Sequence, residues 1–424
     1  MNALPLVLIL LTLIRTPLFV IIAASAMLGF YSQDIDLSVI SIEIYRLAEM
    51  PVLLAIPLFT FAGYMLGESQ ASQRLVNLTR NLLGWLPGGL AIVSIVACAL
   101  FTAFTGASGV TIVALGALLY PALKEAGYSE NFSLGLLTSS GSLGLLFAPA
   151  LPLIIYGVVA QQMNLSQPVS IDDLFLAGIL PGLLMLLMLG LYSMLQRGKS
   201  SVRASITPRD RWQSLKAARW ELPLPILVLG GIYSGYFAVS EAAAVTALYV
   251  FIVEVFILRE IAFARLPGLV RESMIMVGGI MIILGVSLAS TNYLIDADVP
   301  TRLFAFIHEH IDDKLTFLIL LNVFLLALGM MLDIFSALIL IVPIILPIAV
   351  GYGIHPVHLG IIFLANMQLG YFTPPVGMNL FIASYRFEKP MMSLYRATIP
   401  FFLILLICVL IITYVPALSL ALIE

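Results

Sequence analysis

The sequence predicts an all-α, polytopic membrane protein built from two inverted-topology repeats, each with one re-entrant hairpin and one broken helix. Three observations predict this fold class. Hydrophobic residues make up 61% of the chain and charged residues only 10%, whereas soluble domains carry about 25% charged residues. Long apolar segments follow one another, and some are interrupted by Gly, Ser, Thr or Pro. The interruptions of the N-terminal half recur in the C-terminal half.

The uninterrupted apolar segments predict simple spans, because a spanning helix needs about 20 apolar residues. We expect such spans near residues 16–31, 51–67, 175–195, 222–239, 241–258, 273–295 and 399–420. Residues 1–14 are a candidate for a further short span; with no basic start and no small-residue cleavage site, they are interpreted as retained rather than as a signal peptide. Amphipathic segments near 34–50, 69–86 and 259–272 are expected to lie flat at the membrane interface.

The segment 196–221 sets the orientation. Its Lys and Arg residues far outnumber its two acidic residues, and such short basic loops stay in the cytoplasm. Counting spans from this loop places the other basic segments inside as well, at Arg74, Arg80, Lys124, Arg259, Arg265 and Arg271. The acidic segment 296–313 falls outside. The N-terminus lies outside if residues 1–14 span the membrane and inside if they do not.

A shift of 226 residues aligns Gly and Pro residues of the first half of the chain with those of the second half. Pro121 falls on Pro347, Gly127 on Gly353, Gly144 on Gly370 and Pro149 on Pro375, while segment 33–46 falls on 259–272. By the span count the two halves enter the membrane from opposite sides. Such inverted repeats are typical of secondary transporters.

Four apolar stretches are broken near their middle: 88–123, 131–160, 315–350 and 357–386. The first and third predict hairpins, with tips at Thr105–Gly109 and Gly329–Asp333. The second and fourth predict through-going helices broken within 139–152 and 366–377. In membrane helices, small residues often serve only to permit close packing, and prolines often serve only to kink the helix. Irregular backbone at membrane depth, however, needs protein groups or a water-filled cavity to provide hydrogen-bond partners for its N–H and C=O groups.

The paired breaks therefore predict a common site at the membrane midplane. Exposed carbonyls and hydroxyls suit a dehydrated cation such as sodium, and helix N-termini suit an anion. Asp333 is a lone carboxylate in an apolar hairpin, where a charge costs at least ~2.5–3.5 kcal/mol; we expect it to act as both ligand and helix N-cap. Glu254 is expected to snorkel or to pair with Arg259. No Lys or Arg lies near the breaks, which favours cation-coupled uptake of any anion.

Four segments of the chain resemble the large membrane subunit of tripartite ATP-independent periplasmic (TRAP) transporters. They are FTGASGVTIVALGALLYPAL (104–123), GLLFAPALPLIIYG (144–157), SEAAAVTALYV (240–250) and NMQLGYFTPPVGMNLF (366–381). One departure is Ala238-Val239-Ser240, where many members have Thr-Pro-Thr; it lies outside the proposed site. The resemblance implies a sodium-driven, elevator-type importer of an organic acid, such as a C4-dicarboxylate or sialic acid, in the bacterial inner membrane.

The resemblance also implies the partners and site residues. A periplasmic substrate-binding protein delivers the substrate, a small four-helix membrane subunit is expected as a separate chain in the bilayer, sodium is the coupling ion, and neither another cofactor nor a nucleic-acid partner is expected. The implied sodium ligands are Thr105, Ser108, Gly109, Ser139, Ser140 and Gly144 at one site, and Gly329, Asp333, Asn366, Gly370 and Thr373 at the other. The implied substrate contacts are Ser108, Ser142, Pro149, Asn366, Thr373 and Pro374.

The same resemblance divides the chain into scaffold and transport parts. The expected divisions are an N-terminal scaffold with an arm (1–87), transport half 1 (88–160), scaffold helices with loop 196–221 and a second arm (161–314), transport half 2 (315–386) and a C-terminal scaffold helix (387–424).

Three other functions are weighed against transport by a tripartite system. Gly106-Ala107-Ser108-Gly109 fits the serine motif of rhomboid-type intramembrane proteases, but a serine nucleophile needs a base within reach. The histidines, His308, His310, His355 and His358, lie in or beside segments placed outside, while the first hairpin opens inward. A stand-alone transporter of the ion-transporter superfamily fits the repeat equally well. A passive channel leaves the paired hairpins unexplained.

Overall fold

The computed structural model describes residues 16–83, 85–86, 88–163, 165, 167–196, 208–311 and 313–423. The candidate span 1–14 and residues 197–207 of the basic loop lie outside the described residues. Throughout the described part the chain is helical, with no strand. Seven helices are long and apolar enough to cross a membrane, or eight if the bent pair Glu130–Leu146 and Leu151–Gln161 counts as one span. The prediction of an all-α, polytopic membrane protein is confirmed.

Both predicted hairpins are present, and their helix ends obey the 226-residue shift. The first consists of α6 (Gly89–Thr105) and α7 (Ser108–Glu125), and the second of α17 (Lys314–Met331) and α18 (Ile334–Gly351). Shifted by 226 residues, Thr105 falls on Met331 and Ser108 on Ile334. Each tip is only two residues long, shorter than the predicted tips, because each second helix begins at once.

Both predicted broken helices are also present. The first runs through α8 (Glu130–Ser140), η2 (Leu143–Leu146) and α9 (Leu151–Gln161), with a bend of 42°. The second runs through α19 (Pro356–Gly370) and α20 (Met378–Phe387). The two cis X-Pro bonds, Ala148–Pro149 and Pro374–Pro375, occupy equivalent positions in the two breaks.

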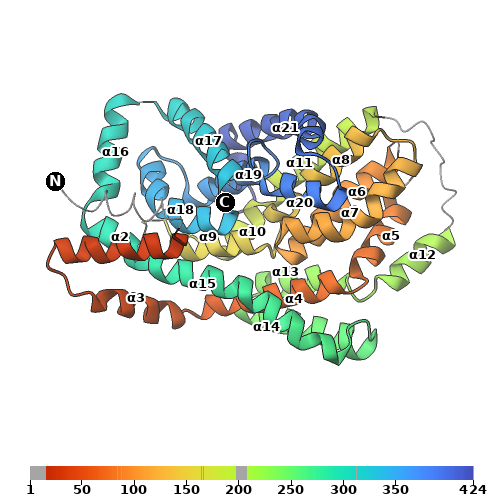
Figure 1. Ribbon diagram of the computed structural model, residues 1–424, viewed down its shortest axis with the longest axis horizontal. Helices are drawn as coiled ribbons and strands as arrows, with labels where there is room; N and C mark the ends of the chain where they lie inside the picture. The colour runs from red at the N-terminus through yellow and green to blue at the C-terminus, as the bar shows by residue number, and fades with distance from the viewer. Residues whose placement is uncertain are drawn as a thin grey trace.

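The repeats are packed against each other crosswise. The returning helix of the first hairpin, α7, packs on α20 of the second broken helix, and α18 packs on α9 of the first. Figure 1 shows α7 and α20 side by side. This exchange brings each hairpin tip to the break of a through-going helix. The first tip is largely buried, whereas Met331 at the second tip is 73% exposed. Both α17 and α18 are also long and apolar enough to cross a membrane.

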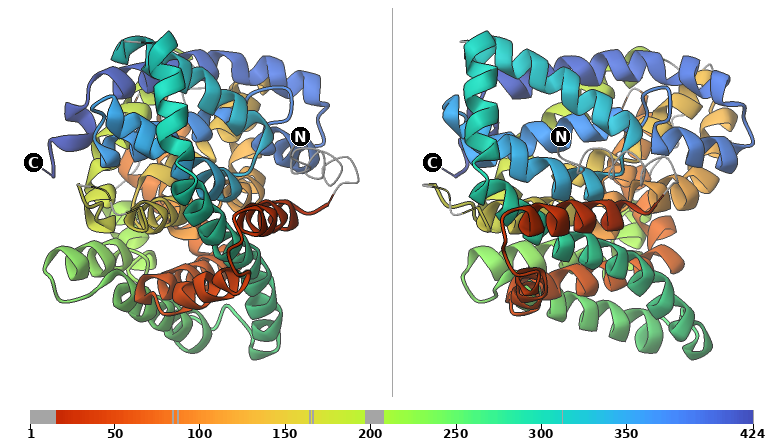
Figure 2. Two further views of the ribbon diagram at one scale, coloured as in Figure 1. Left: turned by 90° about the vertical axis from the view of Figure 1, so that its left-hand side faces the viewer. Right: turned by 60° about the vertical axis from the view of Figure 1, so that its left-hand side comes forward.

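The remaining helices complete two layers (Figures 1 and 2). One layer contains α2 (Leu18–Ser32), α3 (Ser38–Ala48), η1 (Pro51–Leu54) with α4 (Ala55–Glu68), α13 (Pro223–Tyr233), α14 (Val239–Phe251) with the π-helical η3 (Ile252–Ile257), and α15 (Leu266–Asp296). The other contains the hairpins and broken helices with α11 (Ile179–Leu195) and α21 (Met391–Tyr414). The shorter elements are α5 (Ala71–Leu83), α10 (Ile171–Ala177), α12 (Pro208–Ala217), η4 (Phe263–Arg265), α16 (Val299–His310) and α22 (Ala417–Leu420).

Two sequence-based boundaries are wrong. Segment 259–272 is not a separate interfacial helix: after η4 the chain enters α15, which continues without interruption through the predicted span 273–295. The amphipathic helix of the second half is instead α16, which the 226-residue shift aligns with α5. The predicted span 222–239 is also too long, because α13 ends at Tyr233, before the turn at Gly235.

Candidate functional site

The first hairpin turns on a glycine. Gly106 directly follows the last residue of α6; its φ of +66° lies in the left-handed region, and its N–H donates to the Thr102 carbonyl oxygen at 2.8 Å. Glycine adopts this conformation without the steric cost of a side chain. Ala107 is extended and Ser108 already begins α7. Gly106 and Ala107 are thus the whole tip, and they leave the first turn of α7 without a side-chain cap.

Ser108 ties this tip to both broken helices. Its hydroxyl donates to Oδ1 of Asn379 at 2.8 Å, and the Asn379 side-chain amide donates to the Thr138 carbonyl oxygen at 3.3 Å. The Asn379 backbone N–H donates to the carbonyl oxygen of Tyr371 at 2.9 Å. Sequence reasoning missed Asn379, although it stands inside the quoted segment 366–381, two residues after Gly377, the glycine that precedes α20.

A pair of threonines fixes the first break against the same hairpin. Thr102 Oγ1 donates to the Gly141 carbonyl oxygen at 2.8 Å and lies 2.6 Å from Thr111 Oγ1. The Thr111 hydroxyl also lies 3.5 Å from the carbonyl oxygen of Ala107. Gly144 allows this approach, because a Cβ there would lie 2.2 Å from the carbonyl oxygen of Ala99. The break therefore packs directly on the backbone of α6.

The second hairpin is held through Asp333 and the second break. Asp333 Oδ1 accepts hydrogen bonds from the backbone N–H groups of Phe335 and Ser336, both at 3.0 Å, so its predicted role as helix N-cap is confirmed. The Ile334 N–H donates to the buried Tyr371 hydroxyl at 2.6 Å. The Gly377 N–H donates to the Met330 carbonyl oxygen at 3.0 Å.

Two glycines bring the second hairpin and the second break into backbone contact. A Cβ added at Gly370 would lie 2.6 Å from the Cα of Gly329. The two breaks also meet each other, because the Ser142 hydroxyl lies 3.2 Å from the carbonyl oxygen of Gln368, to which it can donate. Ser142 and Gln368 are equivalent under the 226-residue shift. The four breaks thus form one continuous interior region, as the sequence predicts.

Most of the other predicted ligands lie buried around this region. The hydroxyls of Thr105, Ser139, Ser140 and Thr373 are buried, and each donates to the carbonyl oxygen four residues earlier in the chain. A donating hydroxyl still has oxygen lone pairs for a cation. Pro149 is buried, Gly109 is half-buried against Ile382, and Pro374 is exposed. Their assignment as sodium or substrate contacts stays a prediction.

Asn366 is the predicted ligand with an unused acceptor. Its side-chain amide donates to Oδ1 of Asn322 at 2.6 Å and to the Ile362 carbonyl oxygen at 2.9 Å. Its own Oδ1 is buried and has no hydrogen-bond partner among the described residues, and the same holds for Oε1 of Gln368. Buried amide oxygens normally find a partner. The second break thus presents two free acceptors beside the carbonyls of its irregular backbone.

The structure also places two other polar residues. His358 is buried near the start of α19, and its ring nitrogens lie 3.1 Å from the Ser419 hydroxyl and 3.3 Å from the Thr413 carbonyl oxygen. Glu254 pairs with Arg74 rather than with Arg259. The partner of the Ser108 hydroxyl is an amide and not an imidazole, so the protease interpretation lacks its base.

Two inverted repeats whose hairpin tips and helix breaks meet in the interior define the protein as a membrane transport fold. A solved structure with the same fold is the YdaH transporter of Alcanivorax borkumensis. The two align with a TM-score of 0.64 at 16% sequence identity, over 88% of this chain and 86% of that chain.

Sequence comparison carries the identification to a family. Residues 6–418 match the family model for the DctM component of the tripartite ATP-independent periplasmic transporter. The chain is 34% identical to the C4-dicarboxylate TRAP transporter large permease protein of Pseudomonas aeruginosa, over 90% of this chain and 88% of that protein. It is 33% identical to the corresponding permease of Rhodobacter capsulatus, over 93% and 91% of the two chains. The isethionate TRAP permease DctMQ of Oleidesulfovibrio alaskensis is 36% identical over 86% of this chain and 57% of its own length. The chain belongs to the DctM family of TRAP transporter large permeases.

Proposed function

We propose that this large permease imports a small organic acid anion together with sodium ions across the bacterial inner membrane. A periplasmic substrate-binding protein delivers the anion, and a small four-helix membrane subunit completes the transporter as a separate chain. The names of the relatives above support an acidic substrate, because C4-dicarboxylates and isethionate are anions at neutral pH.

The observation that carries the proposal is a chemical difference between two equivalent helix starts. The N-terminus of α7 follows Ala107, which cannot cap it, so its first N–H groups remain suited to an anion. The equivalent N-terminus of α18 is capped by the Asp333 carboxylate. That negative charge makes α18 unsuited to an anion and suited to a cation. The N-terminus of α7 thus suits the substrate carboxylate, and the N-terminus of α18 suits a sodium ion.

The charge balance of this region supports sodium coupling. Neither Lys nor Arg occurs within the breaks, so an entering anion meets no fixed positive charge, and a bound sodium ion supplies it. Each sodium ion that enters also gains about 2.3 kcal/mol per 100 mV of membrane potential. Two sodium ions that enter with a monoanion carry one net positive charge, so the transport cycle retains about half of the free energy that the membrane potential gives to the two sodium ions.

The two-layer arrangement supports an elevator mechanism (Figure 1). In this proposal the hairpins and broken helices move as one body, since hydrogen bonds between the breaks join them. The layer of α2, α4, α14 and α15 serves as the frame.

Uptake by proteoliposomes tests the function directly. The permease is reconstituted with its small subunit, and a radiolabelled C4-dicarboxylate is offered with the binding protein under a sodium, potassium or choline gradient at constant pH. We expect accumulation only with inward sodium and only with the binding protein. Equal uptake in all three salts would refute sodium coupling. Uptake without the binding protein would favour a stand-alone transporter instead.

A further inference from the structure

A buried ionic cluster lies on the side of α6 that faces away from the breaks, and the proposed transport function does not use it. Its centre is Arg74 of α5, whose side chain is 12% exposed. Nε of Arg74 lies 2.5 Å from Oε1 of Glu221, Nη2 lies 3.3 Å from Oε1 of Glu254, and Nη1 contacts Oε1 of Glu260. These four residues, Arg74, Glu221, Glu254 and Glu260, are here called the Arg74 cluster.

The Arg74 cluster carries more negative than positive charge. Three carboxylates share one guanidinium, which leaves two net negative charges when all are ionised. Other cations nearby are committed elsewhere: Arg265 pairs with Glu68 and Glu272, and the exposed Arg219 stacks on Trp220. Within the described residues, Arg74 is the cation paired with these three carboxylates.

The second oxygens of two carboxylates confirm that the cluster is incomplete. Glu221 is 3% exposed and Glu254 is 1% exposed, and Oε2 of each is buried without a hydrogen-bond partner in the described structure. Glu260 differs, because its Oε2 accepts the Gln70 backbone N–H at 2.8 Å. A buried carboxylate oxygen without a partner is strongly disfavoured, and protonation removes both the charge and the missing bond.

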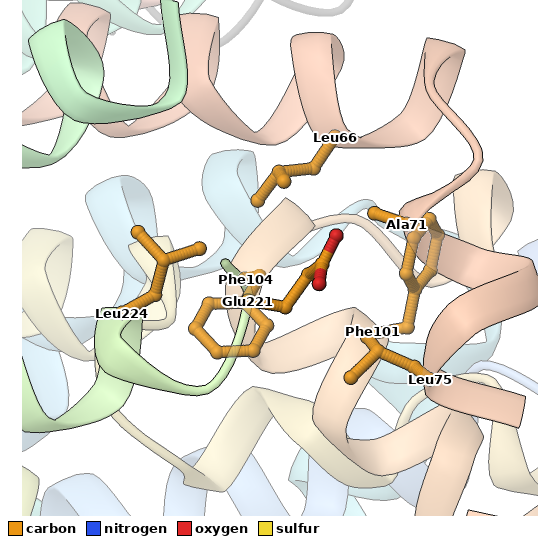
Figure 3. Close-up of a pocket in the computed structure, with 7 residues that line it drawn as sticks. All are labelled: Leu66, Ala71, Leu75, Phe101, Phe104, Glu221 and Leu224. Atoms are coloured by element: carbon orange, nitrogen blue, oxygen red, sulfur yellow. The ribbon is translucent and has the colours of Figure 1, made fainter. Parts of the chain in front are cut away.

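The apolar surroundings of Glu221 leave little room for water to hydrogen-bond its unpaired carboxylate oxygen. Figure 3 shows its carboxylate among Leu66, Ala71 and Phe101, in a small pocket that Leu75, Phe104 and Leu224 complete. Burial raises the pKa of Glu221 above the usual glutamate range, against the opposing effect of Arg74. A metal ion does not fit the cluster, because no group of three His, Cys, Asp or Glu side chains in the described part of the chain is placed to hold one.

We propose that the Arg74 cluster is a proton-binding site, which carries one proton within the Glu221–Glu254 pair at neutral pH. The proton belongs to the pair rather than to one residue, because the two carboxyls interact through the same guanidinium. The ligand is thus a proton, distinct from the sodium proposed at the hairpin tips. Phe101 and Phe104 lie in the last turns of α6, so the protonated site packs directly on the first hairpin.

Removing any one acid makes the proton unnecessary. With Glu254→Gln, only Glu221 and Glu260 face the Arg74 guanidinium, and both can remain ionised. The variant cluster then has one net negative charge, the same as the wild-type cluster with one proton bound. Glu221→Gln has the same effect. Glu68→Gln is the matched control, because Glu68 pairs with Arg265 at the exposed surface and lies outside the cluster.

Infrared spectroscopy of the full chain in lipid nanodiscs tests the site. We expect the wild type at neutral pH to show the carbonyl stretching band of a protonated carboxylic acid. The band should disappear in Glu254→Gln and in Glu221→Gln and persist in Glu68→Gln. It should also disappear from the wild type as the pH is raised, a result that needs no variant to fold. A neutral-pH spectrum that is identical in the wild type and both cluster variants would overturn the proposal.

Thermal unfolding at a series of pH values gives an independent readout. A carboxyl whose folded-state pKa is raised contributes stability that is complete below the ordinary value of about 4.5 and is lost as the pH rises through the folded-state pKa. Within that window the unfolding equilibrium constant of the wild type should increase about tenfold more per pH unit than that of Glu254→Gln. Equal pH profiles would contradict the proposal. A second result would also contradict it: sodium stabilises the wild type relative to choline, and both cluster variants lose this stabilisation. The ligand of the cluster would then be a metal cation.

Discussion

Asp333 offers the sharpest test of the proposed sodium site, because it combines two roles that substitutions can separate. As an N-cap its Oδ1 accepts two backbone hydrogen bonds at 3.0 Å. Replacing a capping Asp by Ala costs about 1 kcal/mol. As a sodium ligand it should contribute to a stabilisation of about 2.7 kcal/mol when sodium is present at a hundredfold its Kd. The two contributions respond differently to the salt.

Three variants resolve the two roles. Asp333→Ala should lose about 1 kcal/mol in choline chloride through the cap, and about 2.7 kcal/mol more in sodium chloride. Asp333→Asn keeps the cap, because Asn caps as well as Asp, and should lose only the sodium-dependent part. Asp313→Ala is the matched control: Asp313 caps the first helix of the same hairpin, α17, through the Thr316 N–H at 3.0 Å. It should lose about 1 kcal/mol in both salts.

Thermal unfolding of the purified chain with its small subunit measures these differences, and proteoliposome uptake follows the function. Asp333→Ala should abolish coupled uptake while the protein still inserts into the membrane. If Asp333→Asn keeps the full stabilisation by sodium and wild-type uptake, Asp333 is a cap alone and the sodium site must lie elsewhere.

Two further predictions concern the contacts between the breaks. Gly370→Ala places a Cβ 2.6 Å from the backbone of α17 and should lower the free energy of unfolding by about 1–3 kcal/mol through overpacking. Thermal unfolding measures this loss. The control Gly279→Ala, whose Cβ would meet open space beside α15, should show a much smaller change. Asn379→Leu removes the acceptor of the buried Ser108 hydroxyl and should lower the free energy of unfolding by about 1–3 kcal/mol, with loss of uptake. Unchanged stability and uptake would show that the Ser108–Asn379 hydrogen bond does not position the hairpin tip.

The features that the sequence predicts correctly are those with a local cause. Gly106 marks the hairpin tip because a left-handed residue is needed there, and Asp333 caps the helix that begins one residue later. Segment 259–272 is misjudged because charged residues at the start of a long helix look like a separate amphipathic piece. Nothing local marks the end of such a piece, and α15 simply extends beyond its apolar part.

The partners of polar residues are predicted less well, because they depend on contacts between distant parts of the chain. Ser108 and Asn379 are 271 residues apart, and Arg74 and Glu254 are 180 apart. Glu254 was expected to pair with Arg259 because that cation is close in sequence. In the structure the π-helical turn and the loop after it direct Glu254 toward α5 instead.

The equivalence of the repeats indicates where function must reside. Since the two hairpin tips lie at equivalent positions, whatever separates their chemistry depends on the side chains at those positions. The first hairpin carries hydroxyls at Thr102, Thr105, Ser108 and Thr111, whereas its equivalents in the second are Leu328, Met331, Ile334 and Ala337. The second hairpin has a carboxylate, Asp333, where the first has Ala107. A neutral hairpin with hydroxyls at these four positions and a charged hairpin with apolar residues there cannot bind a cation equally well, so the two predicted sodium sites should differ in affinity, and the order in which they fill is set by this difference.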